Sequence, residues 1–170
     1  MILSFLMKWW WGGDPDILDP KSGLSRRDIY AIQRSWYPIY KDAGNNGVSL
    51  FIRLFRKNAE TKTFFKTIKD LDEQGIMTSV QFNAHAINLM SAFNSAVVNL
   101  DKPDVVVALM NKLGASHRVR RIHKEHFEDF YGVLVHFLRE EIHLGEDVLK
   151  AWDKYLEFTK KHIFEKLNLN

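Results

Sequence analysis

Proline is scarce in this chain, and its distribution leaves long stretches free to form helix. The 170 residues contain 4 prolines, and after Gly23 only Pro38 and Pro103 remain. Proline interrupts helices, whereas sandwiches of β-sheets need frequent turn residues. No segment shows a sustained alternation of polar and apolar residues, the period expected of a strand. The sequence therefore predicts an all-α fold with six to eight helices.

Apolar residues recur at steps of three and four, the spacing of an amphipathic helix, in several segments. The first helix begins near Ser25, which forms a capping-box pattern with Asp28. Pro38 is expected to end or bend this helix. Residues 41–47 (KDAGNNG) are predicted to form a loop, because glycine and asparagine favour turns.

Five later segments complete the predicted helical body. A helix over residues 48–57 is followed by a short turn-rich stretch, and a long helix begins at residue 78 or 79 and ends near Asn99. Pro103 suits the first turn of the next helix. Two more helices follow the basic link RVRRI and are separated by Gly145.

The first eleven residues, MILSFLMKWWW, form an apolar run that only Lys8 interrupts strongly. A helix that spans a bilayer needs about 20 apolar residues, and a signal peptide would carry a preceding charge and a small-residue cleavage site. Adjacent tryptophans suit a membrane interface, so membrane association through residues 1–11 is one hypothesis. The other hypothesis is that this segment is a tail that packs on the domain or lacks order.

Residues 12–23, rich in glycine, proline and aspartate, have the composition of a linker. We therefore expect an apolar extension and linker over residues 1–23 and one domain over residues 24–167. The protein is expected to be cytoplasmic, and membrane association is the alternative.

The composition excludes several function classes. The chain has no cysteine, which rules out disulfide scaffolds, cysteine zinc fingers, iron–sulfur ligation and thiol nucleophiles. Its formal net charge is +3, and the basic residues are spread among acidic ones. A nucleic-acid-binding protein typically concentrates its basic residues on one face, so no nucleic-acid partner is predicted.

Two of the 7 histidines lie beside apolar helical stripes. His117 follows Leu113 by one helical turn, and His85 precedes Leu89 by one turn. Burying an imidazole without a partner costs about 1–3 kcal/mol. An iron centre in an apolar slot would satisfy both imidazoles, and hydrogen-bonded core histidines are the alternative.

Together with three aromatic residues, these histidines resemble the globin family in order and spacing over residues 24–167. Trp36 resembles the tryptophan of the family's first helix, and Phe55 and Phe65 follow at the family's distances. His85 resembles the distal histidine, and His117 the proximal histidine that binds iron.

Two positions depart from the family pattern. Ala59 stands where a proline is usual, and Phe64 beside Phe65 makes the phenylalanine assignment ambiguous by one residue. The tryptophan-rich extension has no counterpart in the shortest globins. The resemblance is to single-domain globins of the invertebrate type.

The resemblance implies a globin fold around haem b, with His117 on the iron and His85 on the opposite side, as a hydrogen-bond donor or a direct ligand. It implies that Phe51 and Leu89 line the ligand pocket. The residues expected to contact the macrocycle or its propionates are Phe65, Leu113, Ile122, Phe127, Arg118, Arg120 and Arg121.

The function that this resemblance favours is reversible binding of dioxygen, for transport, storage or facilitated diffusion, with CO and NO as further ligands. One alternative is a haem redox enzyme such as a nitric oxide dioxygenase. Because the chain has no G-x-G-x-x-G dinucleotide fingerprint, an external reductase would have to supply its electrons. Another alternative is a six-coordinate gas or redox sensor. The oligomeric state stays open, since no heptad pattern marks an interface.

Overall fold

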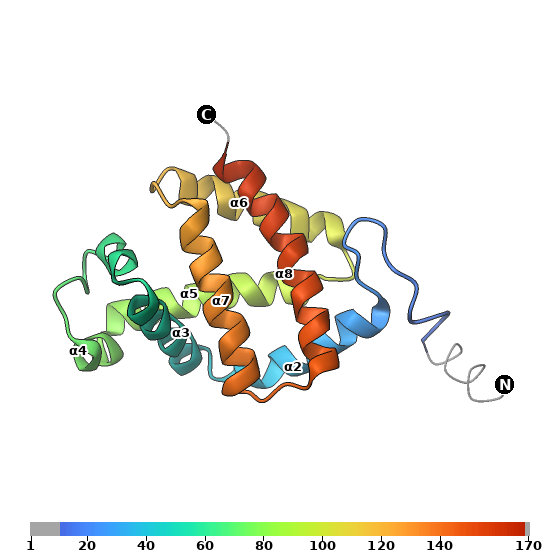
Figure 1. Ribbon diagram of the computed structural model, residues 1–170, viewed down its shortest axis with the longest axis horizontal. Helices are drawn as coiled ribbons and strands as arrows, with labels where there is room; N and C mark the ends of the chain where they lie inside the picture. Colours follow the sequence, from blue (N-terminus) through green and yellow to red (C-terminus); the bar gives the residue numbers. More distant parts are fainter. Residues whose placement is uncertain (1–10, 169–170) are drawn as a thin grey trace.

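Seven α-helices and one 3-10 helix make up most of residues 11–168, the part of the chain that the structure, a computed structural model, describes (Figure 1). The sole β feature in these residues is an isolated bridge between Leu18 and Ser25, so the all-α prediction is confirmed. The elements in chain order are α2 (Arg26–Lys41), α3 (Ala43–Lys57), η1 (Ala59–Phe64), α4 (Glu73–Thr78), α5 (Val80–Val97), α6 (Pro103–Arg118), α7 (Lys124–Glu140) and α8 (Glu146–Leu167).

The predicted capping box starts α2. Ser25 Oγ accepts a hydrogen bond from the Asp28 backbone N–H at 3.1 Å, and the Asp28 carboxylate accepts one from the Ser25 N–H at 2.9 Å. Lys154 of α8 donates to the same carboxylate at 2.9 Å. These bonds hold the pKa of Asp28 below its ordinary value, although partial burial alone would raise it.

Residues 11–25 run along the start of α2. Arg27 donates to the Asp16 carboxylate, its backbone N–H donates to the Pro15 carbonyl at 3.2 Å, and Lys21 pairs with Asp104 at the start of α6. Residues 1–10 of the apolar run lie outside the described residues. None of the helices within residues 11–168 has both the length and the apolar character needed to cross a bilayer.

Pro38, which was expected to end or bend α2, does not end it, because the helix continues to Lys41; the first of these two expectations is therefore wrong. The proline lies in the last turn of the helix, where a missing N–H removes a single backbone bond. Trp36 and Ile39 on either side of it are buried. Their burial stabilises the last turn, and the backbone N–H of Asp42 closes it by donating to the Ile39 carbonyl.

The predicted loop over residues 41–47 is also wrong, because α3 already begins at Ala43. The reason is tertiary packing against α5. A Cβ placed on Gly47 would lie 2.8 Å from the Ala86 carbonyl oxygen, and one on Gly44 would lie 2.9 Å from Asn83 Oδ1. The glycines that lower the helix propensity of this segment therefore permit the close crossing of α3 and α5.

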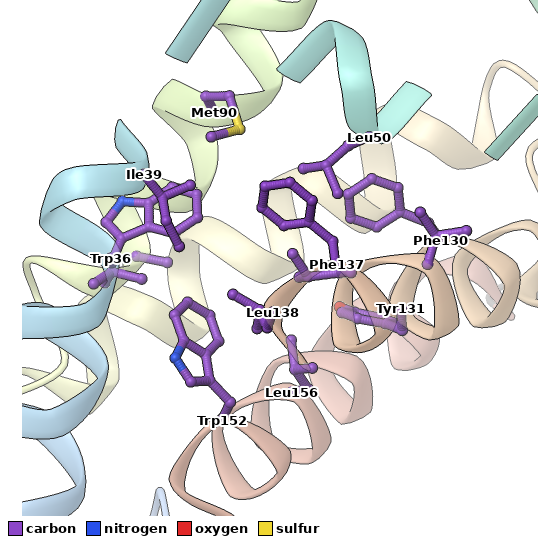
Figure 2. Close-up of a cluster of buried hydrophobic side chains, with 14 of the residues drawn as sticks. Trp36, Ile39, Leu50, Met90, Phe130, Tyr131, Phe137, Leu138, Trp152 and Leu156 are labelled. Carbon is purple, nitrogen blue, oxygen red and sulfur yellow. The ribbon is translucent and has the colours of Figure 1, made fainter. Parts of the chain in front are cut away.

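The core lies between α2, α3, α5, α7 and α8 (Figure 2). The indole rings of Trp36 and Trp152 lie 5.9 Å apart, and Figure 2 shows Leu138 and Leu156 close to Trp152. Trp152 Nε1 donates to Ser35 Oγ at 2.9 Å. The polar edge of a buried indole is thereby satisfied, as burial requires.

The two histidine-bearing helices have different packing partners. α5 packs chiefly against α3, and α6 chiefly against α8, whereas α5 and α6 contact each other little. Several of the apolar and imidazole side chains on these two helices consequently remain outside the buried core: His85 is exposed, and Leu89, Leu113 and His117 are partly buried.

Gly114→Ala tests the tight crossing of α6 over α8. A Cβ at this position would lie 2.5 Å from the Ile163 carbonyl oxygen, so the two helix backbones must separate. Overpacking of this kind costs about 1–3 kcal/mol. We expect the free energy of unfolding in urea to fall by that amount.

Gly132→Ala in α7 is the matched control. Its added Cβ would approach only Lys57 Nζ, at 2.8 Å, and this flexible side-chain end can move away. Alanine has the higher helix propensity, so the control should be neutral or slightly stabilising. Equal losses in both variants would contradict the assigned crossing.

Candidate functional site

An aromatic cluster surrounds His85 near the start of α5. The centroid of the imidazole ring lies 5.4 Å from that of Phe51, 5.0 Å from that of Phe65 and 6.2 Å from that of Phe82. Phe51 and Phe82 are buried, whereas His85 is exposed. The imidazole therefore sits at the edge of an apolar aromatic wall and keeps one side open.

Local sequence features place this cluster. Ser79 caps α5 by accepting a hydrogen bond from the Phe82 N–H at 3.3 Å, which sets the position of the turn that carries His85. The glycine-mediated crossing of α3 brings Phe51 to the same place. Phe82 is a member of this cluster that the family resemblance did not identify. Its position three residues before His85 is the signal that would have identified it, since such residues share a helix face.

The structure distinguishes Phe65 from Phe64. The ring of Phe65 joins the cluster, at 5.3 Å from Phe51 and 5.4 Å from Phe55. Phe64 instead lies on the surface against His126, with a centroid distance of 5.1 Å. Phe65 is therefore the residue of the pair that contacts His85.

His117 lies in the last turn of α6, with its imidazole fixed at one nitrogen. Nδ1 lies 2.9 Å from the Leu113 carbonyl oxygen and 3.3 Å from Ser116 Oγ. Donation from Nδ1–H to the carbonyl selects the tautomer in which Nε2 carries a free lone pair. The ring centroid of Phe127 in α7 lies 5.1 Å from that of His117. Leu113, which is partly buried, lies one helical turn before His117.

Both imidazoles are disposed to be neutral. Burial lowers the pKa of His117, and the positive charge of Arg120 lowers it further, against the opposing effect of the bond to Leu113. Desolvation also lowers the pKa of His85, followed by the charges of His117 and Arg120. The two histidines thus lie within electrostatic range of each other, and a neutral imidazole is the form that binds a metal.

Residues 119–122 form a tight turn after α6. The Ile122 N–H donates to the His117 carbonyl at 3.2 Å, and Arg121 adopts a φ of 58°, a left-handed conformation uncommon for a residue with a side chain. The turn ties partly buried Ile122 to the backbone of His117.

The three arginines near this turn are not equivalent. Arg120 donates to the Ser116 carbonyl, and its charge reaches both imidazoles. Arg118 is the exposed last residue of α6, and Arg121 is exposed in the turn. Of the three, Arg120 is the one linked to both histidines by charge, a distinction that the sequence did not reveal.

The side chains that could bind a metal here suit haem better than they suit a metal ion held by side chains alone. Within residues 11–168, no group of three or more histidine, aspartate or glutamate side chains gathers as a metal site. A porphyrin would itself supply most of the nitrogen ligands of its metal, so an apolar slot and one neutral imidazole would be enough to hold it. His117 provides that imidazole, and the aromatic wall around His85 provides apolar surface.

Comparisons with known proteins agree with this interpretation. The family model described as Globin matches residues 48–163. Globin-1 of Anadara inaequivalvis is 31% identical over 140 residues, covering 82% of this chain and 94% of the relative. Cytoglobin-1 of Oryzias latipes is 28% identical over 162 residues, covering 91% and 92%.

Solved structures share the fold at lower identity. A hexacoordinated heme protein from an anhydrobiotic tardigrade superposes with a TM-score of 0.80 at 19% identity, over 89% of this chain and 99% of that one. A hexa-coordinate hemoglobin of Drosophila melanogaster gives a TM-score of 0.79 at 19% identity, over 83% and 94%.

Arg120→Gln tests the electrostatics of the site. Removing this positive charge should raise the pKa of both His85 and His117 toward the ordinary histidine value, because a nearby cation disfavours the protonated form. Histidine NMR titration of the chain without a bound cofactor measures both values. Lys112→Gln, which removes an exposed cation from the same helix, should leave both unchanged. Unaltered titration in Arg120→Gln would contradict the assigned interaction.

Proposed function

The chain belongs to the globin family, and we propose that it binds haem b between α5 and α6 and takes up dioxygen reversibly, for transport, storage or facilitated diffusion. The observation that carries this proposal is the fixed imidazole of His117, whose Nδ1 lies 2.9 Å from the Leu113 carbonyl and so leaves Nε2 as a ligand atom. Bound haem supplies an iron with an open position for dioxygen, CO or NO. Residues 24–167 form the domain, preceded by the linker.

His117 holds the iron from the side of α6 in this proposal. The bond from Nδ1 to Leu113 keeps the ring from rotating and makes Nε2 a better donor. Phe127, Leu113 and Ile122 cover the macrocycle around it. The charge of Arg120 lies near both imidazoles, so Arg120 is placed to pair with the haem propionates. Arg118 and Arg121 lie beside it in the sequence.

His85 acts from the side of α5. Its neutral imidazole keeps an N–H that donates to a diatomic ligand, and a hydrogen bond to a charged acceptor is worth roughly 1.5–3 kcal/mol. Phe51, Phe65 and Leu89 line the same side and exclude water. An apolar wall of this kind limits proton access to the site and so slows oxidation of the iron.

His117→Ala should abolish stable haem binding, because no other imidazole is placed to replace it among the described residues of α6. The measurement is the Soret absorbance after reconstitution with hemin and gel filtration, in buffer free of imidazole. Added imidazole should restore part of the band. His136→Ala, on the exposed surface of α7, should bind haem normally. An unchanged Soret band in His117→Ala would refute the assignment.

A second candidate function, six-coordinate gas or redox sensing, is favoured by the position of His85. Its ring is exposed on one side and lies within electrostatic range of His117, and the two structural neighbours above are described as hexacoordinate. The visible spectrum of the ferrous protein without added ligand separates the candidates. A five-coordinate spectrum supports a hydrogen-bonding His85, and a six-coordinate spectrum supports direct ligation.

His85→Leu should change a different rate for each of the two candidates. If His85 donates a hydrogen bond, its loss should speed dissociation by roughly 10- to 150-fold. If His85 binds the iron, the ferrous spectrum should become five-coordinate and CO association should accelerate. Stopped-flow absorbance measures both. His123→Leu, at an exposed position, is the control. No change in either rate would exclude both roles.

A further inference from the structure

The outer face of α2 carries a stripe in which cationic and aromatic side chains alternate. Its members follow one another at steps of three or four residues, and all are exposed, with exposed fractions of 48% for Tyr30 and 64% for Tyr37. This stripe, called the α2 stripe below, consists of Arg26, Tyr30, Arg34, Tyr37 and Lys41. It contains no acidic residue.

Contacts within the α2 stripe hold cations beside the aromatic rings. Arg34 Nη1 donates to the Tyr30 hydroxyl at 2.7 Å, and Lys41 Nζ lies 4.9 Å from the centroid of the Tyr37 ring. The carboxylate of Asp28 on the same helix is engaged by Lys154 instead. The stripe therefore presents a positive and partly apolar surface that Asp28 does not neutralise.

The end of the apolar run lies on this stripe. The ring of Trp11 packs edge-on against Tyr30, with centroids 5.5 Å apart, and Arg26 donates to the Trp11 carbonyl. Trp11 is the last residue of MILSFLMKWWW. Trp11 therefore lies against the stripe, and together they form one aromatic and cationic surface.

We propose that this surface binds an anionic lipid membrane, with the α2 stripe and Trp11 against the headgroups. Tryptophan and tyrosine favour the membrane–water interface, and arginine and lysine are attracted to anionic headgroups. The run is too short to span a bilayer, but its tryptophans suit the membrane interface. The inference is independent of haem binding.

The position of the stripe is compatible with an accessible histidine site. Figure 1 shows the segment that leads into α2 and the short helix α4 at opposite ends of the molecule. His85 lies in the first turns of α5, directly after α4 in the chain. No member of the α2 stripe belongs to the histidine site, whose two imidazoles come from α5 and α6.

Flotation of the full-length, haem-loaded protein with lipid vesicles tests the proposal. We expect binding to phosphatidylcholine vesicles that contain phosphatidylserine, and much weaker binding to phosphatidylcholine alone. Each basic residue near such a surface contributes roughly 5-fold in partitioning, so Arg34→Gln/Lys41→Gln should lose about 25-fold. Tyr30→Ser/Tyr37→Ser should also weaken binding, because it removes the interfacial aromatic rings.

Lys66→Gln/Lys161→Gln is the control, because it removes the same charge from two exposed positions outside the stripe. It should bind like the unmodified chain, and an unchanged haem spectrum verifies that each variant folds. Brominated lipid should quench the tryptophan fluorescence, and Trp36 and Trp152 are buried, so the quenching reports the residues of the run.

Three results would overturn the proposal: no flotation with the anionic vesicles, equal losses in the stripe and control variants, or concentration-dependent self-association that the stripe variants abolish without lipid. The last result would assign the stripe to a second copy of the chain.

Discussion

Close backbone contact at two glycines determines where the histidines of this protein lie. At Gly47, α3 approaches the backbone of α5, and at Gly114, α6 approaches the backbone of α8. Each histidine-bearing helix is thus committed to a different partner, and α5 and α6 hardly pack on each other. Several side chains on those two helices, among them His85, Leu89, Leu113 and His117, consequently remain outside the buried core. A larger residue at either glycine would separate a pair of backbones on which the site depends.

The histidine site combines rigidity on one side with openness on the other. His117 is fixed by its bond to the Leu113 carbonyl and by the ring of Phe127. His85 is bounded by aromatic rings but makes no hydrogen bond within residues 11–168 that would fix its tautomer, and it stays exposed on one side. A fixed imidazole suits permanent ligation of iron, and an adjustable one suits a group that meets changing ligands.

Residues with helical spacing and distinctive chemistry were predictable from the sequence. The all-α class, the Ser25–Asp28 capping box and the placement of His85 and His117 beside apolar stripes follow from local periodicity, which each helix expresses largely by itself. Segment 41–47 was not predictable, because its helix depends on contact with α5, which outweighs the low propensity of glycine and asparagine. Pro38 misled for the same reason: burial of Trp36 and Ile39 sustains the turn around it.

The sequence by itself determined the helical class, the family and the two imidazoles, since these depend on residue identity and spacing along the chain. Tertiary structure alone decided that Arg120 is the arginine whose charge reaches both histidines, and that Trp11 rests on the α2 stripe. Each of these is a choice between neighbouring or chemically similar residues. The direction in which a side chain points after a turn is set by packing against residues that are distant in the sequence, and no local sequence pattern predicts it.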